Sequence, residues 1–131
     1  MDLKLTAGMK AEKTEKVTDD NTAMKYGSGG AMVYATPAMV GLMEGACLMA
    51  VDPHLPGGMA TVGISLSIKH LAATPVGMNV RAVAELTGVE GKKLSFKVDA
   101  YDDRELIGTG THDRFIIDLK KFLQKVEDKK G

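Results

Sequence analysis

The sequence predicts an α+β fold in which an antiparallel β-sheet wraps around one central helix and a short helix closes the chain. One long apolar run, residues 37–51, carries helix signals at both ends. Strand-like alternation of apolar and polar residues, separated by turn-forming residues, occurs in five segments: 9–17, 60–70, 78–86, 94–100 and 106–117. The order is therefore strand, helix and four strands, and these four strands can pair as successive antiparallel neighbours.

Composition limits the classes of function. A chain of 131 residues with 44% hydrophobic residues fits a single domain over residues 1–131. Seventeen basic and seventeen acidic residues cancel, so we expect neither nucleic acid nor a membrane surface as a partner. The sequence shows no signal peptide or transmembrane run, and its single cysteine, Cys47, excludes an intrachain disulfide. We therefore expect a cytoplasmic protein.

The apolar run reads as a buried helix with one carboxylate in its middle. Thr36 is expected to be the N-cap and Pro37 the first helical residue, while Asp52-Pro53 ends the helix. Glu44 is the only charged residue between Pro37 and Val51. Because an ionised carboxylate is costly to bury without a partner, Glu44 is the first residue that needs a functional explanation.

The same helix suggests a second chain. It is apolar on nearly all sides, and Gly41 and Gly45 lie one turn apart. One small sheet covers only one side of a helix well, so a second layer is expected close by, and a partner subunit can provide it.

Several strand residues are candidates for a site or for close packing. In segment 60–70 one face is apolar and ends in a histidine, carrying Val62, Ile64, Leu66, Ile68 and His70. In segment 106–117, Gly108 and Gly110 suit bulges or a close backbone approach, and His112 and Arg114 share one face. Asp118 can cap the last helix, in which Leu119, Phe122, Leu123 and Val126 recur at helical spacing.

One segment and two single residues each have both a structural and a functional interpretation. The glycine-rich segment Gly27–Gly30 suits a flexible connection or lid better than a phosphate cradle, since no Lys-Ser/Thr follows it. Cys47 fits a buried, inert thiol better than a nucleophile. His70 fits either a satisfied boundary residue or, if it meets Glu44, a proton carrier.

Four blocks of sequence resemble the hotdog-fold thioesterases related to fluoroacetyl-CoA thioesterase. They are Gly29 to Cys47, with its Ala-Thr-Pro and Leu-Met-Glu motifs, Val62-Gly63-Ile64, Ile68 to Pro75, with its His-Leu-Ala-Ala-Thr-Pro motif, and Gly108 to Arg114. The blocks occur in the same order and at similar spacing from about Thr22 to Lys125. The combination of the first and third blocks is specific, whereas either alone is weak.

The resemblance implies a hotdog fold that forms a homodimer, or a tetramer, with sheets joined edge to edge and active sites between subunits. It implies hydrolysis of acyl-CoA thioesters by a catalytic set of Thr36, Glu44 and His70. Gly63 matches a backbone position beside the thioester, and Arg114 matches an arginine near the acyl pocket. Coenzyme A is then part of the substrate, and no separate cofactor or metal is implied.

These residue types suit the chemistry. Thr36 lies at the positive end of the helix, where a developing anion is favoured. His70 can move protons near neutral pH, and Glu44 can orient the imidazole or act directly on water or on the carbonyl carbon. We therefore expect Glu44 within hydrogen-bond reach of His70 or Thr36, either within one chain or across subunits.

One segment departs from the family. Residues 23–32, before the helix, are fewer than in the fluoroacetyl-specific enzyme and contain no lid phenylalanine. The sequence therefore does not identify the acyl group of the substrate. Two other functions also fit a fold of this kind: an acyl-CoA-binding hotdog protein without turnover, and an enoyl-thioester hydratase or dehydratase.

Overall fold

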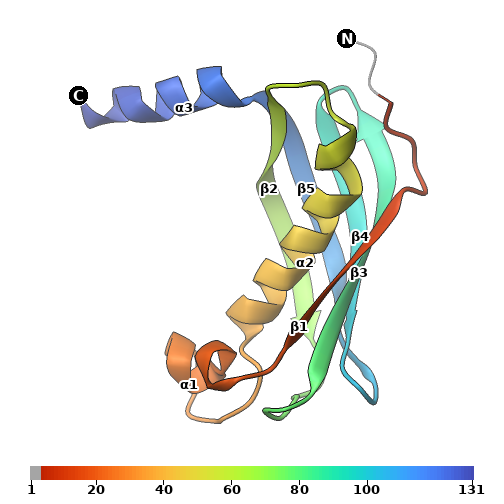
Figure 1. The fold of residues 1–131 in the computed structure, drawn as a ribbon, viewed down its shortest axis with the longest axis vertical. Helices are drawn as coiled ribbons and strands as arrows, with labels where there is room; N and C mark the ends of the chain where they lie inside the picture. Colours follow the sequence, from red (N-terminus) through yellow and green to blue (C-terminus); the bar gives the residue numbers. More distant parts are fainter. Residues whose placement is uncertain (1–3) are drawn as a thin grey trace.

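The computed structural model describes residues 4–131, and one five-stranded antiparallel sheet curves around one long helix (Figure 1). The helix is α2, Thr36–Val51. The strands are β1 (Lys10–Lys16), β2 (Met59–His70), β3 (Asn79–Glu90), β4 (Lys93–Tyr101) and β5 (Leu106–Asp118). Two shorter helices are α1 (Ala23–Tyr26) and α3 (Leu119–Glu127), with 3₁₀ turns at Asp19–Asn21, Asp52–His54 and Asp128–Lys130.

The strand order is β1-β3-β4-β5-β2. The expected pairing of sequential neighbours is correct for β3 with β4 and for β4 with β5, but β2 pairs with β5 rather than β3. The chain between β2 and β3 is bonded instead to the segment before α2, where the Tyr34 N–H donates to the Thr74 carbonyl (2.8 Å). That crossover carries β3 to the other side of the sheet and leaves β2 as an edge strand.

The core lies between α2 and the concave faces of the central strands. The alternation predicted for β3 and β4 is confirmed, because every inward residue is buried: Val80, Ala82, Ala84 and Leu86 on β3, and Leu94, Phe96, Val98 and Ala100 on β4. From α2, Met39, Met43, Ala46, Cys47 and Val51 complete this core with no exposed surface.

The sequence predicts a buried helix, and in the single chain α2 is buried only on the side that faces the sheet. Leu48 and Met49 are exposed, and the Glu44 side chain is 42% exposed. The reason is geometric, since one sheet covers one side of the helix. None of the helices described in residues 4–131 is long and apolar enough to span a bilayer.

The start of α2 differs by one residue from the expectation. Ala35 is the N-cap and its side chain makes no capping bond, Thr36 is the first helical residue, and Pro37 is the second. The helix begins earlier because the Met39 N–H donates to the Ala35 carbonyl (3.0 Å). The Thr36 hydroxyl is thereby free for another partner. The predicted end is confirmed, because α2 stops at Val51 and Asp52-Pro53 begins a 3₁₀ turn.

Strand β2 keeps the predicted bounds closely but not a single apolar face. Its register with β5 shifts between Gly63 and Ser65, which marks a bulge. Ile64 is 52% exposed and Leu66 is also exposed, although both were expected on the buried face. An edge strand with a bulge therefore presents apolar side chains to solvent.

The last helix projects beyond the β2 edge of the sheet (Figure 1). Asp118 caps it as predicted, accepting from the Lys121 N–H (3.1 Å). Every residue of α3 is at least partly exposed, and Leu119, Leu123 and Val126 form an uncovered apolar stripe.

A short helix, α1, precedes the glycine-rich segment Gly27–Gly30, which contains no helix or strand, as expected of a connection. Thr22 caps it by accepting from the Lys25 N–H (3.3 Å), and Gly27 ends it in the left-handed region at φ 70°. The exposed side chains of this region include the apolar Met24, Tyr26 and Met32 together with the charged Lys25.

Gly110 provides a test of the packing between β5 and β2. A Cβ on Gly110 would lie 2.1 Å from the Ser67 carbonyl oxygen, so the close backbone approach predicted from sequence is confirmed. Gly110→Ala should lower the free energy of unfolding by at least about 1–3 kcal/mol, the usual cost of overpacking. Urea denaturation measures it. Gly88→Ala is the matched control, because its Cβ would meet only Ser95 Cβ at 3.9 Å; equal effects would contradict this reading.

Candidate active site

The first polar pair lies at the N-terminus of α2. Thr36 Oγ1 is 2.7 Å from His70 Nδ1, which joins the first residue of the helix to the last residue of β2. The pair opens onto a cavity of about 340 Å³ whose other walls come from the α1 region and from residues 71–73. Tyr34 forms part of this wall; its buried hydroxyl donates to Glu15, and burial raises its pKa.

The surroundings of His70 favour a neutral imidazole. Burial lowers the pKa of His70 below the ordinary 6.5, against a smaller raising effect from the Ala72 backbone. Its Nε2 atom is buried and makes no hydrogen bond of good geometry to the residues described here. A neutral ring whose Nδ1 faces a hydroxyl can accept a proton from that hydroxyl.

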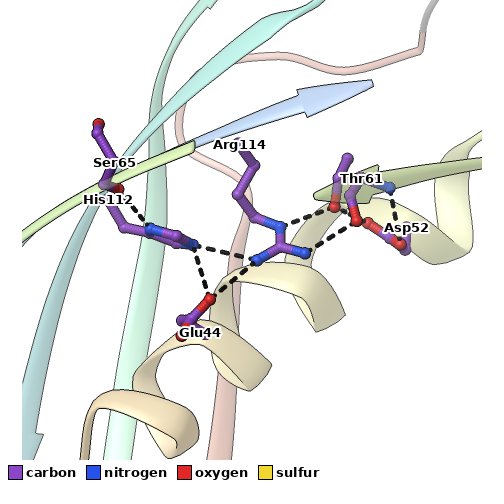
Figure 2. A network of polar contacts seen from close by, with 6 residues as sticks. All are labelled: Glu44, Asp52, Thr61, Ser65, His112 and Arg114. Carbon is purple, nitrogen blue, oxygen red and sulfur yellow. Dashed lines mark hydrogen bonds and ion pairs between the residues drawn. The ribbon is translucent and has the colours of Figure 1, made fainter. Parts of the chain in front are cut away.

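A second polar cluster surrounds Glu44, farther along α2 (Figure 2). Glu44 Oε2 lies 3.8 Å from Arg114 Nη1 and 3.9 Å from His112 Nε2. Both distances exceed those of charge-assisted hydrogen bonds, about 2.7–2.9 Å. The carboxylate is therefore held by opposite charge while its oxygens remain free to bond elsewhere. A cavity of about 240 Å³ adjoins it.

Arg114 is the anchored member of this cluster. It is 5% exposed, and its Nε and Nη2 donate to Thr61 Oγ1 (2.7 Å) and to the Thr61 carbonyl (2.9 Å). The Thr61 hydroxyl in turn donates to Asp52 (2.5 Å) just after α2. The guanidinium is thus fixed to β2 by two hydrogen bonds to Thr61 (Figure 2).

His112 completes the cluster, and sequence reasoning gave it no role. It is 2% exposed; its Nδ1 is 2.8 Å from the Ser65 carbonyl and its Nε2 is 3.1 Å from Arg114 Nη1. The available signal was its position two residues before Arg114, on the same face of a strand that also carries close-packing glycines.

Gly63 faces the same cluster. A Cβ there would lie 3.0 Å from Glu44 Oε2 and 3.1 Å from His112 Cε1. The absence of a side chain therefore lets the carboxylate and the imidazole meet beside the β2 bulge. The resemblance placed both Gly63 and Arg114 near the substrate, and the fold brings both to Glu44.

The five residues expected at the site form two groups within one chain. Thr36 and His70 form one, while Glu44, Gly63 and Arg114 form the other. Glu44 follows Thr36 by eight helical residues, a rise of about 12 Å, so it bonds to neither Thr36 nor His70 of its own chain. The expected hydrogen bond from Glu44 to Thr36 or His70, if it forms, therefore has to join residues of two subunits.

Two other kinds of site were considered, a nucleophilic cysteine and a metal centre. Cys47 is buried as predicted, and burial raises the pKa of its thiol to about 12, which keeps it protonated. Within residues 4–131, no three His, Cys, Asp or Glu side chains gather as metal ligands would.

The anchoring of Arg114 is testable by stability alone. Arg114→Lys keeps the charge but loses the planar fork that bonds Thr61 on two atoms. We expect a loss of about 2–4 kcal/mol in unfolding free energy, since buried acceptors lose their donors. Chemical denaturation measures it. Arg81→Lys is the control, because Arg81 bonds Glu12 at 3.0 Å on the surface; equal losses would show that Arg114 is not anchored as described.

Comparison with known proteins gives consistent relatives. Residues 17–120 match the protein family described as fluoroacetyl-CoA-specific thioesterase. A fluoroacetyl-CoA thioesterase from Streptantibioticus cattleyicolor is 48% identical over 97 residues, which is 74% of this chain and 70% of that protein. A solved structure of the fluoroacetyl-CoA thioesterase FlK has a TM-score of 0.89 at 39% identity, covering 95% of this chain and 97% of that one. A hot-dog-like protein from Thermanaerovibrio acidaminovorans, 21% identical, shares the fold with a TM-score of 0.88 over 97% of this chain and 94% of its own.

Proposed function

This chain belongs to the fluoroacetyl-CoA-specific thioesterase family, and we propose that it hydrolyses acyl-CoA thioesters to a free acid and coenzyme A. The observation that carries the proposal is the 2.7 Å contact between Thr36 and a His70 ring whose pKa is lowered, at a cavity and at a helix N-terminus. Coenzyme A enters as part of the substrate, and water is the co-reactant.

Each group has a role in this proposal. His70 accepts the proton of the Thr36 hydroxyl or of a water held there, and later returns it to the leaving thiolate. The N-terminus of α2 stabilises the negative charge that develops on the thioester oxygen. Glu44 acts either directly on the carbonyl carbon or through water, and its half-exposed carboxylate with unfilled oxygens suits both routes.

We further propose that the active site forms between two subunits of a homodimer. The support is the free edge of β2 with its exposed Ile64 and Leu66, next to the apolar stripe of α3. Antiparallel pairing of β2 with its own copy lays the end of one strand, which carries His70, beside the first half of the other. That half carries Gly63 and faces Glu44, so the pairing brings together groups that one chain keeps apart.

A cytoplasmic location, where acyl-CoA thioesters are formed, is part of the same proposal.

The lack of phenylalanine in residues 23–32 leaves the acyl group open, and the exposed apolar side chains at α1 suit an uncharged acyl group.

The experiment that tests the function is an acyl-CoA panel read by release of free thiol. Fluoroacetyl-, acetyl-, butyryl-, hexanoyl- and phenylacetyl-CoA cover a range of sizes, and kcat/KM is compared among them. Crotonyl-CoA, followed by its double-bond absorbance, tests for hydration in parallel. Thiol release from at least one substrate supports the proposal; binding without turnover, or hydration alone, overturns it.

A shared active site predicts complementation. Thr36→Ala and Glu44→Gln should each lower kcat by about 100-fold or more, because each removes a group used in the reaction. Mixing the two variants under conditions of subunit exchange should restore about a quarter of wild-type activity, since half of the dimers are hybrids with one intact site each. Steady-state assays of the mixture measure this.

Two results would contradict the shared site. One is a mixture that stays as inactive as its components although light scattering shows dimers that exchange. The other is a stable monomer at micromolar concentration that retains full turnover.

The pH dependence follows from the lowered pKa of His70. The neutral ring is the base, so kcat/KM should be level above about pH 6.5 and fall only below it, as the ring takes up a proton. The measurement is kcat/KM from pH 5 to pH 8 with one good substrate. An acid limb centred above pH 7 would mean that another group controls the reaction.

A further inference from the structure

The geometry points to a positioning role for His112: it holds the Arg114 guanidinium away from Glu44, which keeps the carboxylate free to act. This inference rests on the proposed function only for its consequence in turnover. The contacts that carry it are those of the buried cluster in Figure 2.

The hydrogen-bond partners of His112 fix the tautomer of its ring. A backbone carbonyl only accepts, so the 2.8 Å contact to Ser65 puts a hydrogen on Nδ1. A guanidinium only donates, so the 3.1 Å contact to Arg114 Nη1 requires the lone pair on Nε2. A second hydrogen, on Nε2, would point at a fixed cation. His112 is therefore an acceptor for Arg114 in this arrangement.

Glu44 lies near the same nitrogen of Arg114. Arg114 Nη1 lies 3.1 Å from His112 Nε2 but 3.8 Å from Glu44 Oε2. Nε and Nη2 are bonded to Thr61, and Nη1 carries two hydrogens, of which the bond to His112 uses one and thereby sets where the Nη1 group lies. Without the imidazole lone pair, the natural partner of Nη1 is the carboxylate, at about 2.8 Å.

The partner of Arg114 Nη1 affects the reactivity of the Glu44 carboxylate. A carboxylate that accepts a short, charge-assisted hydrogen bond from a buried arginine is a weaker base and nucleophile than one that is held at a distance. The gap at Glu44 therefore has a cause in the structure, and the cause is the neighbouring imidazole.

Three variants separate positioning from simple packing. In His112→Gln the side-chain oxygen can reach the place of Nε2 and accept from Arg114. In His112→Asn the amide can still donate to Ser65, as Nδ1 does, but stops short of Arg114. His112→Leu lacks both functions. Thr111→Val is the control, because Thr111 is the exposed neighbour on the opposite face of β5.

The kinetic expectation is a loss in kcat with rescue by one variant. His112→Leu and His112→Asn should lower kcat by at least about tenfold, within the range that a compromised base or nucleophile gives, with KM changed by less than about twofold. His112→Gln should stay within about threefold of wild type, and Thr111→Val should match wild type. If Gln is as impaired as Asn, or if the loss falls on KM, the inference is wrong.

A structural readout decides the point without any turnover. In crystals of the Asn and Leu variants, Arg114 Nη1 should lie about 2.8 Å from Glu44, whereas the Gln variant should keep the 3.8 Å separation. An unchanged separation in the Asn variant overturns the inference even if activity falls. A wild-type protein that fails to release thiol refutes the proposed function but leaves this measurement able to decide on His112.

Discussion

The fixed spacing along α2 is the constraint on which the rest of the site depends. Thr36 and Glu44 stand eight positions apart on one rigid helix, about 12 Å of rise, and no side-chain rotation closes that gap. The helix therefore divides the chemistry into a hydroxyl–imidazole pair at its N-terminus and a carboxylate cluster near its middle. A reaction that uses both groups at one carbon atom needs a second chain, and the twofold symmetry of a dimer then makes two such sites together.

The edge strand β2 is the place where pairing with a second chain could bring the two groups of site residues together. Its bulge turns Ile64 outward, and Gly63 beside it leaves room for Glu44 and His112. Most proteins protect an exposed strand edge with charges or a covering segment. Here the edge exposes two large apolar side chains, Ile64 and Leu66, both groups of site residues lie along it, and α3 projects beyond it (Figure 1). These features have a common physical explanation if the edge is buried against a copy of itself.

Sequence patterns predicted the fold where local physics decides it. The alternation of β3 and β4 is clear because one of their faces packs against α2, and the Asp118 cap depends only on residues of its own turn. The partner of β2 was misjudged, because pairing with β5 depends on a crossover that leaves no periodic signal. Its apolar face was misjudged for a related reason: alternation shows which side chains are apolar, not whether a second chain covers them. Thr36 was placed one residue off, since a side chain that could cap the helix bonds His70 instead.

The site was only partly visible in the sequence for a similar reason. The resemblance supplied Thr36, Glu44, His70, Gly63 and Arg114, but not the way in which one chain divides them. It also left out His112, because an imidazole that accepts from an arginine has no motif of its own. Its role emerges only once the partners of the three guanidinium nitrogens are assigned. Thr61 uses two donor atoms of Arg114 and His112 uses the third, so the neighbouring carboxylate attracts the guanidinium without closing on it. The buried Arg114 cation forms its hydrogen bonds with Thr61 and His112, so its positive charge acts on Glu44 while the carboxylate oxygens stay free. A carboxylate that acts on a thioester needs both conditions.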